Sequence, residues 1–432
     1  MSLLFPFLTA YDPPESSEGT LDPLGLEQIA DRLAVQLVPA VRERMQRIRF
    51  LTAMAVGAYV TEGLDENREY RDSAPYLVWE WLVIEALIRT EKENRRNWGV
   101  PGTDVTRRAL NSHGYLDARS YLKTPRIFGF NGVYKRLAIH LGIVDVHLAP
   151  GPNAKQLVDA WTRGMGLGGF KGAQSLLSTW SAAVKKGLKA EPPRTKVNWS
   201  RQEWEQLAKA FDPSTARPRE KRCLRDLLLS PEKRHTGALP MLWSLQEEFE
   251  EDDYREETLH DRLQERAPGY TPLLDAIRKY ENFSRGLQDG FDVLRTRAAR
   301  LETGGYEIAD IAKNKDFRIS VDKLHERFAA TKQALSAVSI ADGSLPALFD
   351  ERFAAFGDPR EPAEWAMTLV AHHETIQKGK SAEGKRSWFD RLDDTRIFVR
   401  GDYRDPLTAI QPGRYVHAFR GGPIRRFWKD LG

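Results

Sequence analysis

The sequence predicts a mainly helical, multi-domain protein with a winged-helix-like unit in its N-terminal half and a few short strands. Three observations lead to this fold class. Apolar residues recur at helical spacing along most of the chain. The 432 residues exceed what one ordinary hydrophobic core encloses. One segment also alternates helices, a strand and a tight turn. We expect two domains, residues 1–190 and 191–432, which divide at the polar stretch Lys189–Lys196.

Helices are expected wherever an apolar stripe follows the i, i+3, i+4 spacing. The first such region begins near Leu26 and continues to about Glu62, with a break at Pro39. Ser200-Arg201-Gln202-Glu203 is a capping box and starts another helix. Further helices are predicted over residues 75–96, 173–187, 217–229, 270–302, 318–339, 361–378 and 423–430. Short strands are predicted at Thr395–Val399 and Arg414–Val416, within a partly extended tail at 387–432.

The winged-helix-like unit covers residues 103–164. Its order would be a helix from Thr103, a short helix at 117–122, a helix at 131–141, a strand at 143–148 and a turn at 150–152. A further helix would follow at 153–163. Helix, helix, helix, strand and tight turn is the order of a winged helix. A generic helical bundle with one short strand gives the same order, so both interpretations stay open.

Positive charge gathers in two segments, although the formal net charge is only +4. Residues 89–137 carry eleven Lys or Arg against four Asp or Glu, and residues 376–432 carry thirteen against seven. Between them, residues 247–262 contain nine acids and two arginines. Basic segments of this kind are typical of surfaces that bind nucleic acids or acidic partners.

The first basic segment overlaps the winged-helix-like unit. On its third helix, Lys135 and Arg136 would face outward with Asn131 at the edge, as a recognition helix requires. The phosphate contacts would come from Arg107, Arg108, Arg119, Lys123 and Arg126. Ile139 also faces outward in this projection. An apolar residue there equally suits a unit that docks a protein.

The second basic segment interleaves cations with aromatic residues. Lys385 and Arg386 lie near Trp388, and Arg425 and Arg426 belong to the last predicted helix. This pattern suits binding of a nucleic-acid backbone. The alternative is a solvated C-terminal face whose aromatic residues lie in the core.

The catalytic motifs tested give no reaction. Gly164–Gly169 has the spacing G-x-G-x-x-G but follows a helix instead of a strand, so we interpret it as a helix end and loop. The lone Cys223 lies among leucines and is expected in the core. Because a single cysteine cannot form a disulfide within the chain, a reducing compartment is favoured. No cofactor or metal site is predicted. The best polar cluster is His372-His373-Glu374 with Gln377 and Lys378, next to Glu383 and Lys385. His372 is expected to be a hydrogen-bonded core residue.

Two stretches resemble an uncharacterised family of bacterial proteins associated with anti-phage defence gene clusters. One runs from Phe7-Leu8-Thr9-Ala10-Tyr11-Asp12-Pro13 through Leu21-Asp22-Pro23-Leu24-Gly25 to Arg49-Phe50-Leu51. The other is Tyr415-Val416-His417 followed by Ile424-Arg425-Arg426-Phe427-Trp428-Lys429-Asp430-Leu431. The resemblance implies action beside a helicase, a nuclease or a methyltransferase. It supplies no catalytic residues.

The leading functional hypothesis is therefore a non-catalytic DNA-binding or adaptor subunit of a bacterial defence complex. The first alternative is a protein-interaction scaffold without direct DNA contact. The second is a nuclease-like effector that uses the region of His373 and Lys385. The sequence contains no convincing signal peptide and no membrane span, so a cytoplasmic protein is expected.

Overall fold

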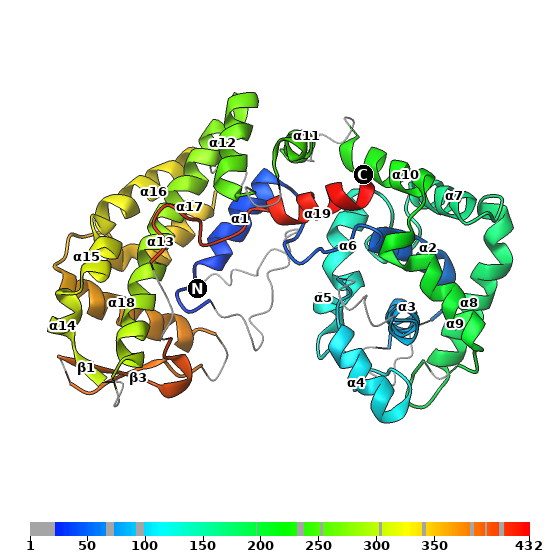
Figure 1. Cartoon of the computed structure of the whole chain (residues 1–432), viewed down its shortest axis with the longest axis horizontal. Helices are drawn as coiled ribbons and strands as arrows, with labels where there is room; N and C mark the ends of the chain where they lie inside the picture. Colours follow the sequence, from blue (N-terminus) through cyan, green and yellow to red (C-terminus); the bar gives the residue numbers. More distant parts are fainter. Residues whose placement is uncertain are drawn as a thin grey trace, which may run out of the picture. The chain divides into compact units, whose positions relative to one another are not determined.

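The computed structural model describes most of the chain, in the ranges 22–65, 73–91, 99–195, 197–230, 237–250, 254–301, 305–338, 343–380, 384–393, 395–405 and 410–432. These residues are mainly helical, as the sequence predicts, and the chain forms two compact units (Figure 1). Unit 1 combines Phe249–Phe419 with the N-terminal segment that ends at Leu37, and unit 2 combines Val38–Glu248 with Arg420–Gly432. The boundary expected near residue 190 falls inside unit 2. Within the described ranges, no helix combines the length and the apolar character needed to cross a bilayer.

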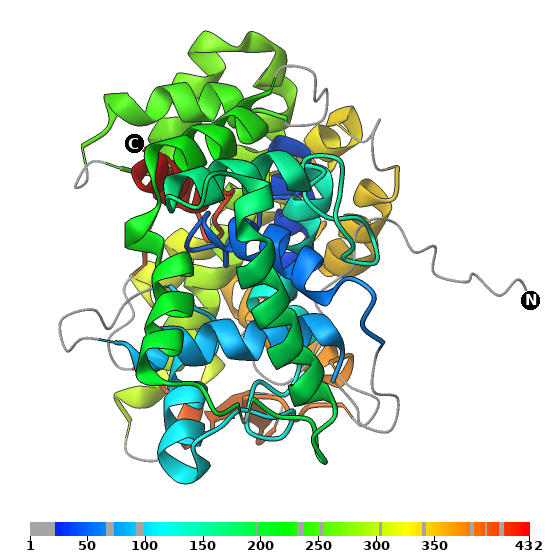
Figure 2. The same cartoon turned by 90° about the vertical axis from the view of Figure 1, so that its right-hand side faces the viewer.

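Unit 2 is built around a cluster of large aromatic side chains, Trp79, Trp161, Trp180 and Phe211. Trp161 stacks on Phe211 with ring centroids 5.7 Å apart, and Trp79 lies 5.5 Å from Trp180. A Cβ at Gly57 would lie 2.4 Å from the Trp79 ring, so a glycine permits this close approach. The surrounding helices (Figures 1 and 2) are α2 (Phe50–Thr61), α3 (Pro75–Arg89), α7 (Ala154–Gly164), α8 (Gln174–Leu188) and α9 (Arg201–Phe211).

The segment predicted to be a winged helix forms α4 (Thr103–His113), α5 (Pro125–Phe128) and α6 (Phe130–His140), followed by α7. The helix expected at 117–122 is wrong, because Asp117 accepts hydrogen bonds from the next amides and forms a turn. The strand expected at 143–148 is also wrong. Val144 and Pro150 form only one isolated bridge, and Asp145 closes a tight loop between them. The described residues therefore show no winged helix.

A buried ion pair fixes the start of α10 (Pro218–Leu229) against α2. The side chains of Arg49 and Glu220 are 2% and 1% exposed, and two N–O distances between them are 3.0 Å. Arg49 also donates to the carbonyl oxygen of Asp212 and, at 2.6 Å, to the hydroxyl oxygen of Thr215. Glu220 consequently directs its charge into the unit. The remaining helices of unit 2 are α11 (Leu239–Ser244) and α19 (Gly421–Leu431).

Unit 1 is organised along one long helix, α13 (Thr271–Ala299), which contacts most of its other elements. A small antiparallel sheet has the strand order β1-β3-β2, with Tyr306 opposite Ile397 and Phe389 opposite Val399. The strands are β1 (Gly305–Glu307), β2 (Phe389–Arg391) and β3 (Arg396–Val399). The helices are α1 (Glu27–Leu37), α12 (Glu256–Arg266), α14 (Ile308–Ala312), α15 (Lys315–Val321), α16 (Leu324–Val338), α17 (Leu345–Phe353) and α18 (Pro362–Lys378).

The long periodic segments are predicted best. Helices α3, α8, α10, α13, α18 and α19 lie where the apolar spacing places them, and the Ser200 capping box is present. The helix predicted over 318–339 is interrupted at 322–323, where Lys323 adopts a positive φ of 49°. The strand at Thr395–Val399 is confirmed as β3, but Arg414–Val416 forms no strand. Residues 1–21 and 92–98 lie outside the described residues. The end of the helix predicted over 75–96 and part of the N-terminal stretch that carries the family resemblance fall there.

Candidate nucleic-acid interface

Two exposed cations of the first basic segment line a shallow groove in unit 2. Its volume is about 290 Å³, and it lies between α4 and the turn at 117–121. Arg108 on α4 and Arg119 on the turn are both exposed and both line it. The remaining lining residues are Val105, Ala109, Ser112, His113, Ser120 and Tyr121. Two guanidinium groups thus line one groove, and such groups suit phosphate oxygens. The Ser112 hydroxyl donates to the Arg108 carbonyl oxygen at 2.9 Å and the Tyr121 hydroxyl donates to Glu80 at 2.8 Å.

Local backbone geometry fixes where Arg119 lies. The Asp117 carboxylate accepts hydrogen bonds from the amides of Arg119 and Ser120 at 2.9 and 2.7 Å. The Ser120 hydroxyl in turn accepts from the Asp117 amide at 2.9 Å. Such Asx turns are rigid because a side chain replaces a turn hydrogen bond. The Asx turn therefore holds Arg119 beside the groove. Its guanidinium forms no ion pair with any described residue, so its N–H donors are available.

The neighbouring cations differ in their pairing. Arg107 is 37% exposed and pairs with Glu91 at 2.8 Å and with Asp104 at 2.9 Å. Lys123 and Arg126 are exposed on the approach to α5 and within it. Arg107 is therefore largely neutralised, whereas Arg108 and Arg119 form no ion pair with a described residue.

The third helix of the segment, α6, does not present the predicted reading face. Asn131 is only 4% exposed, and its backbone and side-chain N–H groups each donate to Glu80 at 2.9 Å. The expectation of an exposed edge at Asn131 is wrong, because a buried carboxylate binds both of its donors. Lys135 and Arg136 are half-buried.

Beneath the groove lies a buried carboxyl group that has hydrogen bonds but no ion pair with a described residue. Glu80 on α3 is fully buried and accepts a 2.8 Å hydrogen bond from the Tyr121 hydroxyl, in addition to those from Asn131. Burial raises the pKa of the Glu80 carboxyl to about 7, against the lowering effect of these hydrogen bonds. Tyr121 belongs to both the groove lining and this network. Sequence analysis did not identify this group, although an acid within the apolar run Tyr76–Ile88 was the available signal.

In unit 1, the second basic segment shows mixed exposure. Arg386 is 74% exposed and lies 3.2 Å from Asp390. Lys385 is half-buried, and its amide donates to the Gln377 carbonyl oxygen at 2.8 Å.

In unit 2, Arg425 and Arg426 bind backbone carbonyl groups. Arg425 donates to the carbonyl oxygen of Gln246 at 2.5 Å. Arg426 donates to the carbonyl oxygens of Met45 and Glu43 at 3.1 and 2.9 Å. The structure thus places both arginines as tethers of α19 within unit 2.

The histidine cluster on α18 holds the chain near Pro23 and Leu24. His372 donates to the Leu24 carbonyl oxygen at 2.8 Å, which confirms it as a hydrogen-bonded core residue. His373 donates through Nδ1 to the Pro23 carbonyl oxygen at 2.8 Å and accepts the Trp388 amide at Nε2 at 3.0 Å. Burial lowers the pKa of His373 to about 4, so its imidazole is neutral near pH 7. Both of its nitrogens are engaged, and Glu383 lies outside the described residues.

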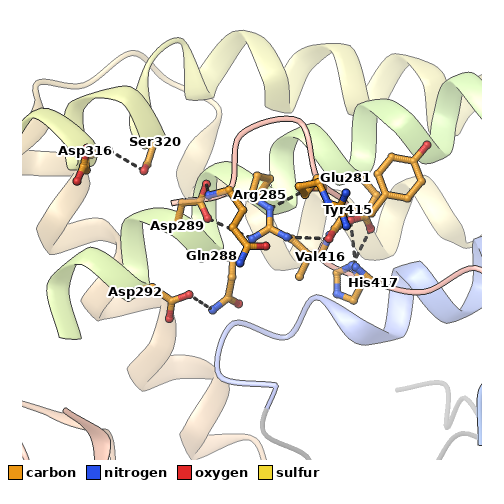
Figure 3. Close-up of polar contacts among 12 residues, drawn as sticks. Glu281, Arg285, Gln288, Asp289, Asp292, Asp316, Ser320, Tyr415, Val416 and His417 are labelled. Carbon is orange, nitrogen blue, oxygen red and sulfur yellow. Dashed lines mark hydrogen bonds and ion pairs between the residues drawn. The ribbon is translucent and has the colours of Figure 1, made fainter. Parts of the chain in front are cut away.

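The richest polar network of unit 1 lies along α13. Glu281 accepts the amides of Val416 and His417, and its carboxylate lies 2.7 Å from Nδ1 of His417 (Figure 3). Burial lowers the pKa of the His417 imidazole, but the charge and hydrogen bond of Glu281, together with the charges of Asp22 and Glu27, raise it overall.

Further along the same helix, Arg285 donates to the carbonyl oxygens of Arg414 and Tyr415 at 2.9 and 2.7 Å and pairs with Asp289 at 3.2 Å. Asp292 is likewise paired, with Arg295 at 3.0 Å. Figure 3 shows Glu281 and Arg285 directed toward the extended segment at Tyr415–His417. These groups bind the chain itself, and the described residues contain no group of three or more His, Cys, Asp or Glu able to hold a metal ion.

Comparisons with family models, curated proteins and solved structures find no match. The functional assignment therefore rests on the residues themselves. Of the sequence-predicted site residues, Arg108 and Arg119 are brought together at one groove, with Lys123 and Arg126 exposed on the chain that follows. Asn131, Arg425 and Arg426 bind other parts of unit 2.

Proposed function

We propose that the protein is a non-catalytic DNA-binding or adaptor subunit, and that unit 2 contacts the DNA backbone at the groove between α4 and the 117–121 turn. The observation that carries this proposal is the placement of exposed Arg108 and Arg119 beside one groove, neither in an ion pair with a described residue. Arginine forks bind phosphate oxygens in pairs. The proposal rests on this surface and does not require a winged helix.

The expected mode of binding is backbone contact without base reading. The groove is shallow, and Asn131, the residue best suited to read a base, is buried against Glu80. Contacts to phosphates position a protein on DNA but carry little sequence information. Affinity should therefore depend weakly on sequence and strongly on salt.

The test measures binding of a fluorescent duplex by anisotropy, with the full chain, at several salt concentrations between about 50 and 200 mM. Replacing both arginines, in the double variant Arg108→Ala and Arg119→Ala, should weaken binding about tenfold and reduce the slope of log K against log salt by about two. The matched control replaces Lys185 and Lys186, two exposed cations at the end of α8, by alanine.

Equal losses for the groove variant and the α8 control would show that binding is diffuse and would contradict the groove. Absence of duplex binding by the unmodified protein at low salt would contradict DNA binding altogether. The resemblance of the chain ends to the defence-associated family supports placing this subunit in an anti-phage complex. Co-purification with the products of neighbouring genes tests that part separately.

A further inference from the structure

A second cluster of cations lies at residues 217–225, from the residue before α10 into its second half, and was not predicted from the sequence. Arg217, Arg219 and Arg222 are exposed, and Lys221 and Arg225 are half-buried. None of these side chains forms an ion pair or a hydrogen bond with a described residue. Positive charge in the first turns of a helix also faces the positive end of the helix dipole. The fold therefore places unpaired cations where a helix alone would disfavour them.

Of the two acids on α10, Asp226 is exposed and forms no ion pair with a described residue, and Glu220 is buried and does not neutralise these cations. Glu220 is 1% exposed and binds Arg49 inside unit 2. The Arg49–Glu220 pair thus fixes the start of α10, while its outer face carries several cations against one exposed acid, Asp226. If Glu220 balanced the surface charge of α10, it would pair with a cation of that helix instead of Arg49.

The cluster extends onto the end of α7. A Cβ at Gly164 would lie 2.9 Å from Cβ of Arg217, so these two backbones are in close approach. The pKa of Asp159 on α7 is lowered, chiefly by its hydrogen bond with Arg163, and the charge of Arg219 contributes. Asp159 pairs with Arg163 at 2.6 Å. Arg217, Arg219 and Arg222 form no ion pair with a described residue.

We propose that the face of α10 formed by Arg217, Arg219 and Arg222, here called the α10 face, binds the phosphate backbone of a nucleic acid. Charge complementarity selects this occupant, since three exposed arginines that form no ion pair with a described residue outnumber the one exposed acid, Asp226, and match a polyanion. Four of the five cations at residues 217–225 are arginines and one is a lysine. The planar guanidinium group of arginine binds two phosphate oxygens at once.

The α10 face is distinct from the groove at α4. Figure 1 shows α10 and α4 at opposite ends of unit 2. This inference rests on the proposed function, because it assigns unit 2 a second region of backbone contact. Two separated surfaces contribute independently to binding, so their losses should add in free energy and multiply in affinity.

The experiment uses the same duplex-binding assay with the full chain. The triple variant Arg217→Ala, Arg219→Ala and Arg222→Ala should lose about tenfold or more in affinity and lower the salt slope by up to about three. The control triple variant replaces Lys185, Lys186 and Lys189 by alanine and so removes the same amount of charge. These lysines are exposed on or next to α8. Its loss should be under about threefold, since it removes only diffuse attraction. Combining the α10 triple variant with the groove variant should multiply their separate losses.

An α10 variant that binds like the control would overturn this inference and leave the groove proposal intact. Failure of the unmodified protein to bind would instead overturn the proposed function. Polyglutamate serves as a competitor of equal charge. If it displaces the duplex as well as unlabelled duplex does, and only when the α10 arginines are present, the face takes an acidic protein and not a nucleic acid.

Discussion

The α13 region of unit 1 and the α4 groove of unit 2 use the same residue type in opposite ways. On α13, Arg285 and Arg295 are 13% and 18% exposed and bind carboxylates and backbone carbonyl groups of their own unit. At the groove, Arg108 and Arg119 are exposed, and neither forms an ion pair with a described residue. The first pair of arginines organises the fold, and the second is available to another molecule.

We infer from this difference that cations without ion pairs indicate a binding surface, and that the number of cations alone does not. Residues 376–432 carry thirteen Lys or Arg, yet Arg400, Arg425 and Arg426 bind groups within their own units. The α10 face carries fewer cations but leaves them unpaired. The positions of the acids explain both cases. Acids on α13 pair with the arginines of the same helix, whereas Glu220 of α10 pairs with Arg49 instead.

The largest expected effect concerns a paired arginine. Arg285→Ala should lower the free energy of unfolding of unit 1 by about 3 kcal/mol, because it removes three hydrogen bonds and leaves the carboxylate of Asp289 buried without its cation. Hydrogen exchange of residues 410–419 should rise, since Arg285 tethers that segment. Urea unfolding of the full chain, with exchange measured by mass spectrometry, tests this.

The double variant Arg285→Met with Asp289→Leu is the control for that experiment. Removing both charges should restore part of the lost stability, since no buried charge remains unpaired. If Arg285→Ala unfolds at the same urea concentration as the unmodified protein, the distinction between paired and unpaired arginines fails.

An intermediate effect is expected at Glu80, beneath the groove. Its folded-state pKa of about 7 lies above the ordinary value of 4.5, so between these pH values the folded state binds a proton that the unfolded state releases. The contribution of Glu80 to stability is therefore greatest at low pH and is lost as pH rises through 7. Glu80→Gln, whose amide can donate to Tyr121 and accept from Asn131, should be more stable than the unmodified protein by about 1–3 kcal/mol at pH 8.

Toward pH 5 the difference in stability should shrink, because the Glu80 carboxyl is then neutral in the folded state and the unfolded state releases fewer protons. Urea midpoints measured from pH 5 to 8 give the difference directly, and other titrating groups cancel between the two proteins. A difference that stays constant across this range would show that Glu80 is ionised throughout.

Periodicity predicted the long helices because each buries one continuous apolar stripe, as α3 and α13 do. It failed where polar side chains decide the backbone, at the turn of Asp117 and the tight loop of Asp145. It also missed β1 and β2, each three residues long, whose partners come from distant positions such as Tyr306 and Ile397. For the candidate site, the sequence indicated the basic segment and most of its exposed cations. The burial of Asn131 depends on Glu80, fifty-one positions away, which no local pattern reveals.

The smallest expected effect belongs to the unpaired arginines themselves. The double variant Arg108→Ala and Arg119→Ala should change the free energy of unfolding by less than about 0.5 kcal/mol, because both side chains are exposed and no described acid pairs with them. Arg108 donates only a 3.4 Å hydrogen bond to the Asp104 carbonyl oxygen, and alanine maintains the helix there. Urea unfolding measures this on the same preparation that is used for duplex binding. A loss above about 1 kcal/mol would mean that these arginines belong to the fold, as Arg285 does, and weakened binding would then reflect unfolding. Unchanged stability together with weakened binding would assign the two side chains to a partner.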